Sequence, residues 1–122
     1  MDRKKAKQDY KQALRPMGIV RVRNLKDGRC YLMASADTRG AINSLRFQLK
    51  MGAFATSPEL ARDWKELGEE SFVIEVIDEL KPVEDPEHDY RADLQVLEEL
   101  WLDKLKPYGD RGYHTLRRLP KG

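Results

Sequence analysis

Few residues of this 122-residue chain combine a side-chain type and a spacing that could do chemistry. Glu98 falls four residues after Leu94 and three before Trp101, so helical spacing places its carboxylate on the apolar side of a helix over residues 90–105. A carboxylate in that position must be paired, hydrogen-bonded, protonated or bound to a cation. Glu98 is therefore a candidate metal ligand. The alternative is a place at the edge of the apolar stripe, where it reaches water or an arginine.

Basic side chains form a second candidate group. Arg21 and Arg23 alternate with Val20 and Val22 on a predicted strand, so both guanidinium groups share one face and need solvent or an anion there. The candidate nucleic-acid contacts are Arg21, Arg23, Arg29, Arg39, Arg46 and Lys50, together with the lysines of the N-terminus. Such contacts to phosphates give affinity without sequence specificity and weaken as salt rises. The sequence leaves open which of these side chains share a face.

Charge is divided unevenly along the chain. Residues 1–51 contain 13 Lys/Arg and 4 Asp/Glu, residues 52–106 contain 6 and 16, and residues 107–122 contain 4 and 1. The blocks carry net charges of +9, −10 and +3, which together give the overall +2. This asymmetry predicts a positive face that could meet a polyanion. Two alternatives remain: the blocks pair with each other in the fold, or the acidic half (residues 59–103) binds a basic protein.

Several classes of site are absent from the sequence. There is no Gly-rich phosphate loop, no Ser/His/Asp set, no internal repeat and no spaced metal cluster. The single cysteine, Cys30, allows no internal disulfide and is expected to be a small buried strand residue. His88 and His114 are expected in solvent rather than in catalysis. With neither a long apolar run nor a signal peptide, the protein is expected in the cytoplasm.

Short apolar runs and turn residues predict the elements that would position these side chains. Strands near 18–23 and 29–34 flank Asp27-Gly28 as a β-hairpin, and residues 71–80 alternate as a third strand, expected to be central. Helices are expected from a cap at Ser35 or Asp37 to Lys50, from Ser57-Pro58 to Gly68, and over residues 90–105. Leu60, Trp64 and Leu67 are expected to form the apolar side of the second of these helices.

The expected fold class is α/β (α+β): a small three-stranded antiparallel sheet flanked by helices, preceded by a basic helix over residues 2–15. The expected domain organisation is a basic N-terminal helical extension (1–16), a folded domain (17–114) and a basic C-terminal tail (115–122).

Two short segments carry a resemblance to a known family. Gly18-Ile19-Val20 and Tyr31-Leu32-Met33, ten residues apart, resemble the paired signature of the GIY-YIG nuclease superfamily, with valine for its first tyrosine and methionine for its second glycine. Further matches are Asn24, the Gly68-Glu69-Glu70-Ser71-Phe72 lead into the third strand, Glu98-Glu99-Leu100-Trp101, and Gly112-Tyr113-His114 in place of a closing Gly-Tyr-Asn. The predicted order of elements also resembles that of the family.

The resemblance implies hydrolysis of a phosphodiester by a metal-assisted water. It assigns catalytic roles to Tyr31, as the second tyrosine, and to Glu98, as the ligand of a divalent cation such as Mg²⁺. Most of the other polar family positions are apolar here, and His114 is a possible residue of the closing motif. The tyrosine of the family's first strand corresponds to Val20 here. The arginine and the histidine that the family carries on its first helix correspond to Ala41 and Leu45, and a further histidine falls near Phe54. The closing asparagine corresponds to His114.

Losing one general acid or base costs about 10²–10⁴ in rate, so these replacements predict a degenerate domain. Our first hypothesis is a protein that binds nucleic acid, DNA rather than RNA, with little or no cleavage. The second is a weak Mg²⁺-dependent endonuclease that uses Tyr31 and Glu98, with Arg39 or Arg46 substituting for the missing phosphate clamp. The third is a protein-interaction or regulatory module that uses the acidic half.

Overall fold

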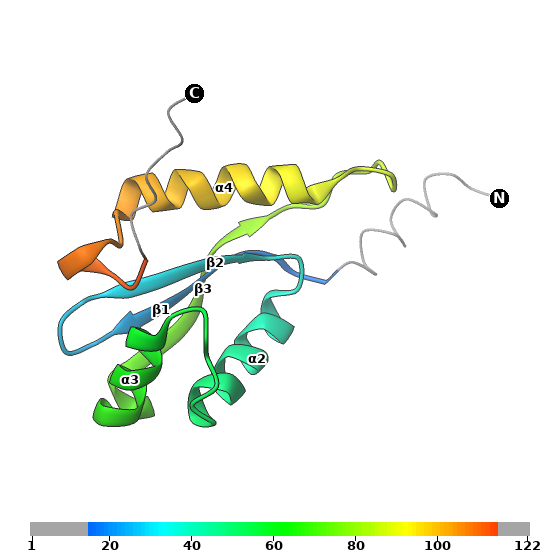
Figure 1. The fold of residues 1–122 in the computed structure, drawn as a ribbon. Coiled ribbons are helices and arrows are strands. Elements are labelled where there is room, and N and C mark those ends of the chain that lie inside the picture. The colour runs from blue at the N-terminus through cyan, green and yellow to red at the C-terminus, as the bar shows by residue number, and fades with distance from the viewer. Residues whose placement is uncertain (1–14, 115–122) are drawn as a thin grey trace.

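The computed structural model describes residues 15–114. The predicted N-terminal helix, apart from Arg15, and the basic tail lie outside the described residues. The described part is an α+β fold in which a three-stranded antiparallel sheet carries α2 (Thr38–Lys50) and α3 (Pro58–Leu67) on one side and α4 (Tyr90–Leu105) on the other (Figure 1). Within residues 15–114, no helix is long and apolar enough to cross a membrane.

The predicted hairpin is confirmed. β1 (Met17–Asn24) pairs antiparallel with β2 (Cys30–Ser35), with Val22 opposite Tyr31 and Val20 opposite Met33. The connecting turn uses Gly28 at φ 83°, a backbone conformation that residues with a Cβ rarely adopt. Because the register fixes the faces of the strands, the side chains of Val20, Val22 and Tyr31 point to the same side of the sheet.

The third strand was predicted to be central, and this is wrong. The strand order is β2-β1-β3, so β3 (Phe72–Leu80) is an edge strand and β1 is the central one. The apolar residues on both faces of β3 had suggested a central position. In the structure that pattern reflects a sheet with helices on both faces, which is a different property from having a strand on each side.

The helix boundaries follow their capping residues. Asp37 caps α2 by accepting a hydrogen bond from the N–H of Gly40, and Ser57 caps α3 by accepting one from Leu60, directly before Pro58. Gly68 ends α3 at φ 88°. Two short 3₁₀ helices complete the fold: η1 (Glu69–Ser71) leads into β3, and η2 (Gly109–Arg111) follows α4.

The main core lies between the sheet and the pair α2 and α3. It is formed by Val20, Val22, Tyr31, Leu45, Leu49, Phe54, Leu60, Trp64, Phe72 and Tyr113. Leu67, expected in this layer, is instead 37% exposed at the end of α3. On the α4 side, Ile19 and Leu32 are fully buried. Cys30 is a buried strand residue, as predicted.

We expect the core to be most sensitive where α2 contacts it. Leu45 is only 2% exposed, so Leu45→Ala should lower the free energy of unfolding by about 2–5 kcal/mol, because it removes buried methyl groups and leaves a cavity. The matched control is Leu100→Ala on α4, where the leucine is 61% exposed and the cost should be much smaller. Urea denaturation of both variants measures the difference. Equal losses would show that the core is not where the structure places it.

Candidate functional site

The outer edge of β2 brings the candidate site together. Because β2 is an edge strand, every second residue directs its backbone N–H and C=O groups away from β1. The N–H of Leu32 donates to His114 Nε2 at 2.8 Å, and the N–H of Ala34 donates to Glu98 Oε2 at 3.0 Å. The C=O of Cys30 accepts from the N–H of Tyr113 at 3.0 Å. The open edge is therefore satisfied by the side chains of Glu98 and His114 and by the backbone of Tyr113, all residues that the family resemblance had singled out.

Tyr31 lies beside this edge and is largely buried. Its ring stacks on that of His114, with centroids 4.7 Å apart and planes 4° apart, and meets Phe54 edge-on at 5.5 Å. Burial, reinforced by the nearby Glu98 carboxylate, raises the pKa of the Tyr31 hydroxyl. At neutral pH the hydroxyl is therefore protonated and is a weak base.

His114 was expected in solvent, and the structure corrects this. The side chain is half-buried because the closing segment runs along β2 and back to the end of α4, where the N–H of His114 donates to the C=O of Pro107. Burial lowers the pKa of His114, against the opposing effect of the Glu98 carboxylate. Since Nε2 accepts the Leu32 N–H, the proton of the neutral ring sits on Nδ1.

Glu98 is half-buried at the position that helical spacing indicated. Within residues 15–114 its only hydrogen bond is the one that Oε2 accepts from Ala34. The described residues contain no cluster of three or more His, Cys, Asp or Glu side chains that could hold a metal ion. Mg²⁺ commonly keeps several waters and takes one or two carboxylates plus substrate phosphates, so Glu98 fits as a single protein ligand for a hydrated ion.

The family's remaining polar positions are filled by packed apolar side chains. Val20, Leu45 and Phe54 are buried in the same cluster as Tyr31, and Ala41 packs against that cluster. Within the described residues, these positions therefore offer no proton donor or acceptor beside the Tyr31 ring. The space that acid–base groups would need belongs to the core.

Arg39 and Arg46 are poorly placed to substitute for the missing clamp. Residues on an α-helix are about 100° apart, so Arg39 and Arg46 project about 160° and 140° away from Ala41 around the axis of α2. Both arginines are exposed, whereas Ala41 packs against the core. The helix therefore directs these two charges away from the expected clamp position.

The six predicted cationic contacts fall into three separate groups. Arg39, Arg46 and Lys50 form one exposed stripe along α2. Arg21 and Arg23 are half-buried on the α4 face of the sheet, where Arg21 forms an ion pair with Glu75. The guanidinium of Arg29 is bound within the fold by Asp27, Glu59 and Asp63 and lies 4.6 Å from the centre of the Tyr113 ring.

A buried polar network that the sequence did not reveal holds Arg29 in place. Asn24 Nδ2 donates to the Tyr113 hydroxyl at 2.9 Å, and that hydroxyl donates to Asp63 Oδ2, also at 2.9 Å. Burial raises the pKa of Tyr113, which keeps the hydroxyl a donor. Asn24 and Tyr113 belong to the motifs noted above. Asp63 lies in the middle of α3, and nothing in its sequence spacing marks it.

The sheet, its helices and the edge site together define a GIY-YIG-like fold. Two solved structures are similar to this chain: the catalytic domain of the homing endonuclease I-TevI (TM-score 0.65, 20% identity, covering 80% of this chain and 95% of that one) and a single-residue variant of the same domain (TM-score 0.65, 17% identity, 81% and 92%). No protein-family model and no curated protein matches the sequence. At these identities the likeness shows the fold.

The pH dependence of stability should depend on His114. Because folding lowers the pKa of His114, protonation favours the unfolded chain. The stabilising contribution of His114 is therefore complete above the unfolded pKa of about 6.5 and is lost as the pH falls towards the folded pKa. The free energy of unfolding should decrease between about pH 7.5 and 5.5, and this slope should be smaller in His114→Asn.

Urea denaturation across this pH range measures the slope. The matched control is Leu100→Ala, which changes an exposed side chain without a titratable group and should keep the wild-type slope. An unchanged slope in His114→Asn would contradict the assignment.

The hydrogen bond between Glu98 and Ala34 should be measurable by itself. Glu98→Gln keeps an oxygen that can accept the Ala34 N–H, whereas Glu98→Ala leaves that amide without its partner. We expect Glu98→Ala to cost about 1–3 kcal/mol of stability and to speed hydrogen exchange of the Ala34 amide, with a smaller effect for Glu98→Gln. Glu99→Ala, on the exposed side of α4, is the control. If Ala34 exchange is equally fast in all three variants, Glu98 does not protect the edge.

Proposed function

We propose that this protein binds nucleic acid, DNA rather than RNA, through a basic surface, and that it hydrolyses phosphodiesters slowly or not at all. The observation that carries the second part is the burial of Val20, Leu45 and Phe54 in the same core cluster as Tyr31, at the positions where the family resemblance expects polar catalytic groups. The ligand class is supported by the fold, because the two similar structures are catalytic domains of an endonuclease.

The α2 stripe is the surface that we assign to phosphate contacts. Arg39, Arg46 and Lys50 are exposed and spaced so that they project from one side of the helix. Phe47, 65% exposed beside them, offers an aromatic face on which a base could stack. This combination of cations and an exposed ring suits a flexible polyanion with bases.

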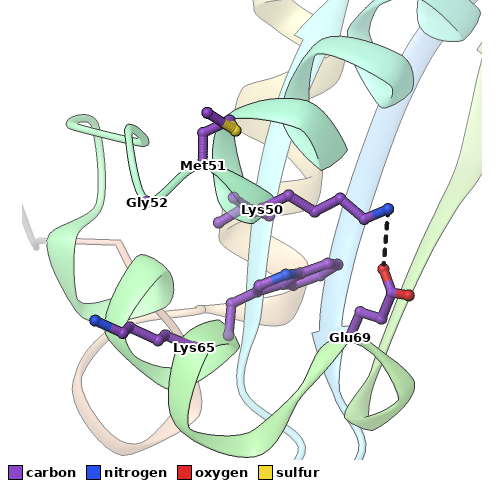
Figure 2. Close-up of a pocket in the computed structure, with 7 residues that line it drawn as sticks. Lys50, Met51, Gly52, Lys65 and Glu69 are labelled. Atoms are coloured by element: carbon purple, nitrogen blue, oxygen red, sulfur yellow. Dashed lines mark ion pairs between the residues drawn. The ribbon is translucent and has the colours of Figure 1, made fainter.

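Lys50 can exchange its present partner for a phosphate. It lies at the rim of a pocket of about 460 Å³ at the end of α2, where its ammonium group meets Glu69 at 3.8 Å (Figure 2). Both side chains are more than half exposed, and ion pairs in such positions contribute little to stability. A nucleic-acid phosphate could therefore replace Glu69 at low cost.

A specific observation also favours the second candidate, a weak Mg²⁺-dependent endonuclease. Tyr31, Glu98 and His114 are brought together at one edge, and the second carboxylate oxygen of Glu98 has no hydrogen bond among the described residues. Mg²⁺ held by Glu98 would supply charge stabilisation to a phosphodiester. The chain's own contribution would be the Tyr31 hydroxyl, which would donate a hydrogen bond to the phosphodiester or orient it. The raised pKa of Tyr31 makes it a poor base.

Binding is tested with labelled single- and double-stranded DNA and RNA across a salt series. We expect the wild-type protein to bind DNA, with an affinity that falls as the salt concentration rises. Arg39→Gln and Arg46→Gln should each weaken binding across sequences and reduce the salt slope by about 1. Arg91→Gln, which removes an exposed charge from α4, is the control and should leave both unchanged. Salt-independent binding would contradict an electrostatic interface.

Cleavage is scored in the same samples in Mg²⁺ and in EDTA. We expect no cleavage or only a trace of it. Mg²⁺-dependent cleavage that disappears in Glu98→Gln would instead establish the weak endonuclease, because that variant removes the metal-binding charge while keeping a hydrogen-bond acceptor. If neither binding nor cleavage occurs and a basic protein is retained at near-physiological salt, the domain is an interaction module that uses its acidic half.

A further inference from the structure

A second pocket lies on the face of the sheet opposite the α2 stripe. It has a volume of about 320 Å³, opens to solvent and is lined by the β1–β2 hairpin, the end of α4 and η2. Its lining residues are Arg21, Arg23, Asp27, Gly28, Cys30, Leu105, Asp110 and Arg111. One water takes up about 30 Å³ in the liquid, and ligand pockets begin near 300 Å³, so there is room for a small molecule or for one group of a larger one.

The pocket is rich in positive charge that the fold does not neutralise. Of its three arginines, Arg21 forms an ion pair with Glu75, whereas Arg23 and Arg111 have no ion pair among the described residues. Its two carboxylates are less available: Asp27 is bound to Arg29 at 2.7 Å, which leaves Asp110 as the acidic group without an ion pair. The free charge that remains at the pocket is therefore positive.

The guanidinium groups also have donors without acceptors. The Nε atoms of Arg21 and Arg23 are buried and, in the described part of the chain, have no hydrogen-bond partner. A buried charged donor without an acceptor is unfavourable, and such groups are normally paired. An anion in the pocket would offset this charge. The Nε atoms themselves are shielded, so the anion would contact the outer N–H groups of these half-buried arginines, and phosphate oxygens match the planar array of guanidinium N–H groups.

We infer that this pocket binds a phosphate group through Arg21, Arg23 and Arg111. The phosphate could belong to a free nucleotide or to the end of a nucleic-acid strand, because both present the same charged oxygens. This inference goes beyond the proposed function, since it needs neither the α2 stripe nor the Tyr31 and Glu98 edge, and a phosphate compound alone can test it.

The test follows the Nε–Hε signals of the arginines by NMR while inorganic phosphate, and then a mononucleotide, is added to the protein. We expect the signals of Arg21 and Arg23 to shift in a saturable way. Arg23→Gln and Arg111→Gln should weaken binding about tenfold or more, since each removes a charge-assisted contact. Arg91→Gln, which removes an exposed charge at the opposite end of α4 from the pocket, is the matched control and should bind as the wild type does. Arg111 is exposed in η2, so its variant remains informative if Arg23→Gln fails to fold.

Oligonucleotides with and without a 5′-phosphate then distinguish the two sources. Tighter binding of the phosphorylated strand, lost in Arg111→Gln, assigns the pocket to a strand end, and a preference for the free nucleotide assigns it to a small ligand. Equal shifts with sodium chloride, or no saturable shift at millimolar phosphate, would overturn the inference. Phosphate binding without any oligonucleotide binding would uphold it while contradicting the proposed function.

Discussion

The open edge of β2 is the constraint on which the candidate site depends. An edge strand leaves backbone groups without strand partners, and this fold satisfies three of them with Tyr113, His114 and Glu98. Glu98 thereby ties α4 to the sheet, and the closing segment is held alongside the strand. The side chains that resemble catalytic residues thus have a structural task that is independent of catalysis. Their presence in this chain is therefore no measure of activity.

The interior next to this edge is apolar where the resemblance expects polar groups. Tyr31 lies between the core and the edge, with Phe54 against its ring on one side and His114 stacked on the other. Burial and a neighbouring carboxylate keep its hydroxyl protonated, and His114 is held neutral with one nitrogen committed to the backbone. Tyr31 and His114 are therefore both uncharged at neutral pH, beside the Glu98 carboxylate.

The positively charged side chains of the N-terminal half lie on opposite faces of the sheet. The α2 stripe faces solvent on one side, and Arg21 and Arg23 line a pocket on the other. Arg29 belongs to neither surface, because three carboxylates and the Tyr113 ring hold it inside the fold. Part of the acidic half thus pairs with basic residues, as in the pairs Arg21–Glu75 and Lys50–Glu69, while other cations remain available to ligands.

Local pattern was enough to predict the hairpin, the three helices, the caps of the first two helices and the fold class, because turn geometry, capping and hydrophobic periodicity act over a few residues. It also placed Glu98 on the inner side of α4. It could not predict that β3 is an edge strand. Apolar residues on both faces of a strand indicate that helices cover both faces of the sheet, and they do not indicate whether another strand lies on each side. Nor could it place His114 on Tyr31 or Asp63 on Tyr113, residues 83 and 50 positions apart in the chain. Only the tertiary structure decided those contacts, because they arise from the docking of the closing segment and α3 around the hairpin.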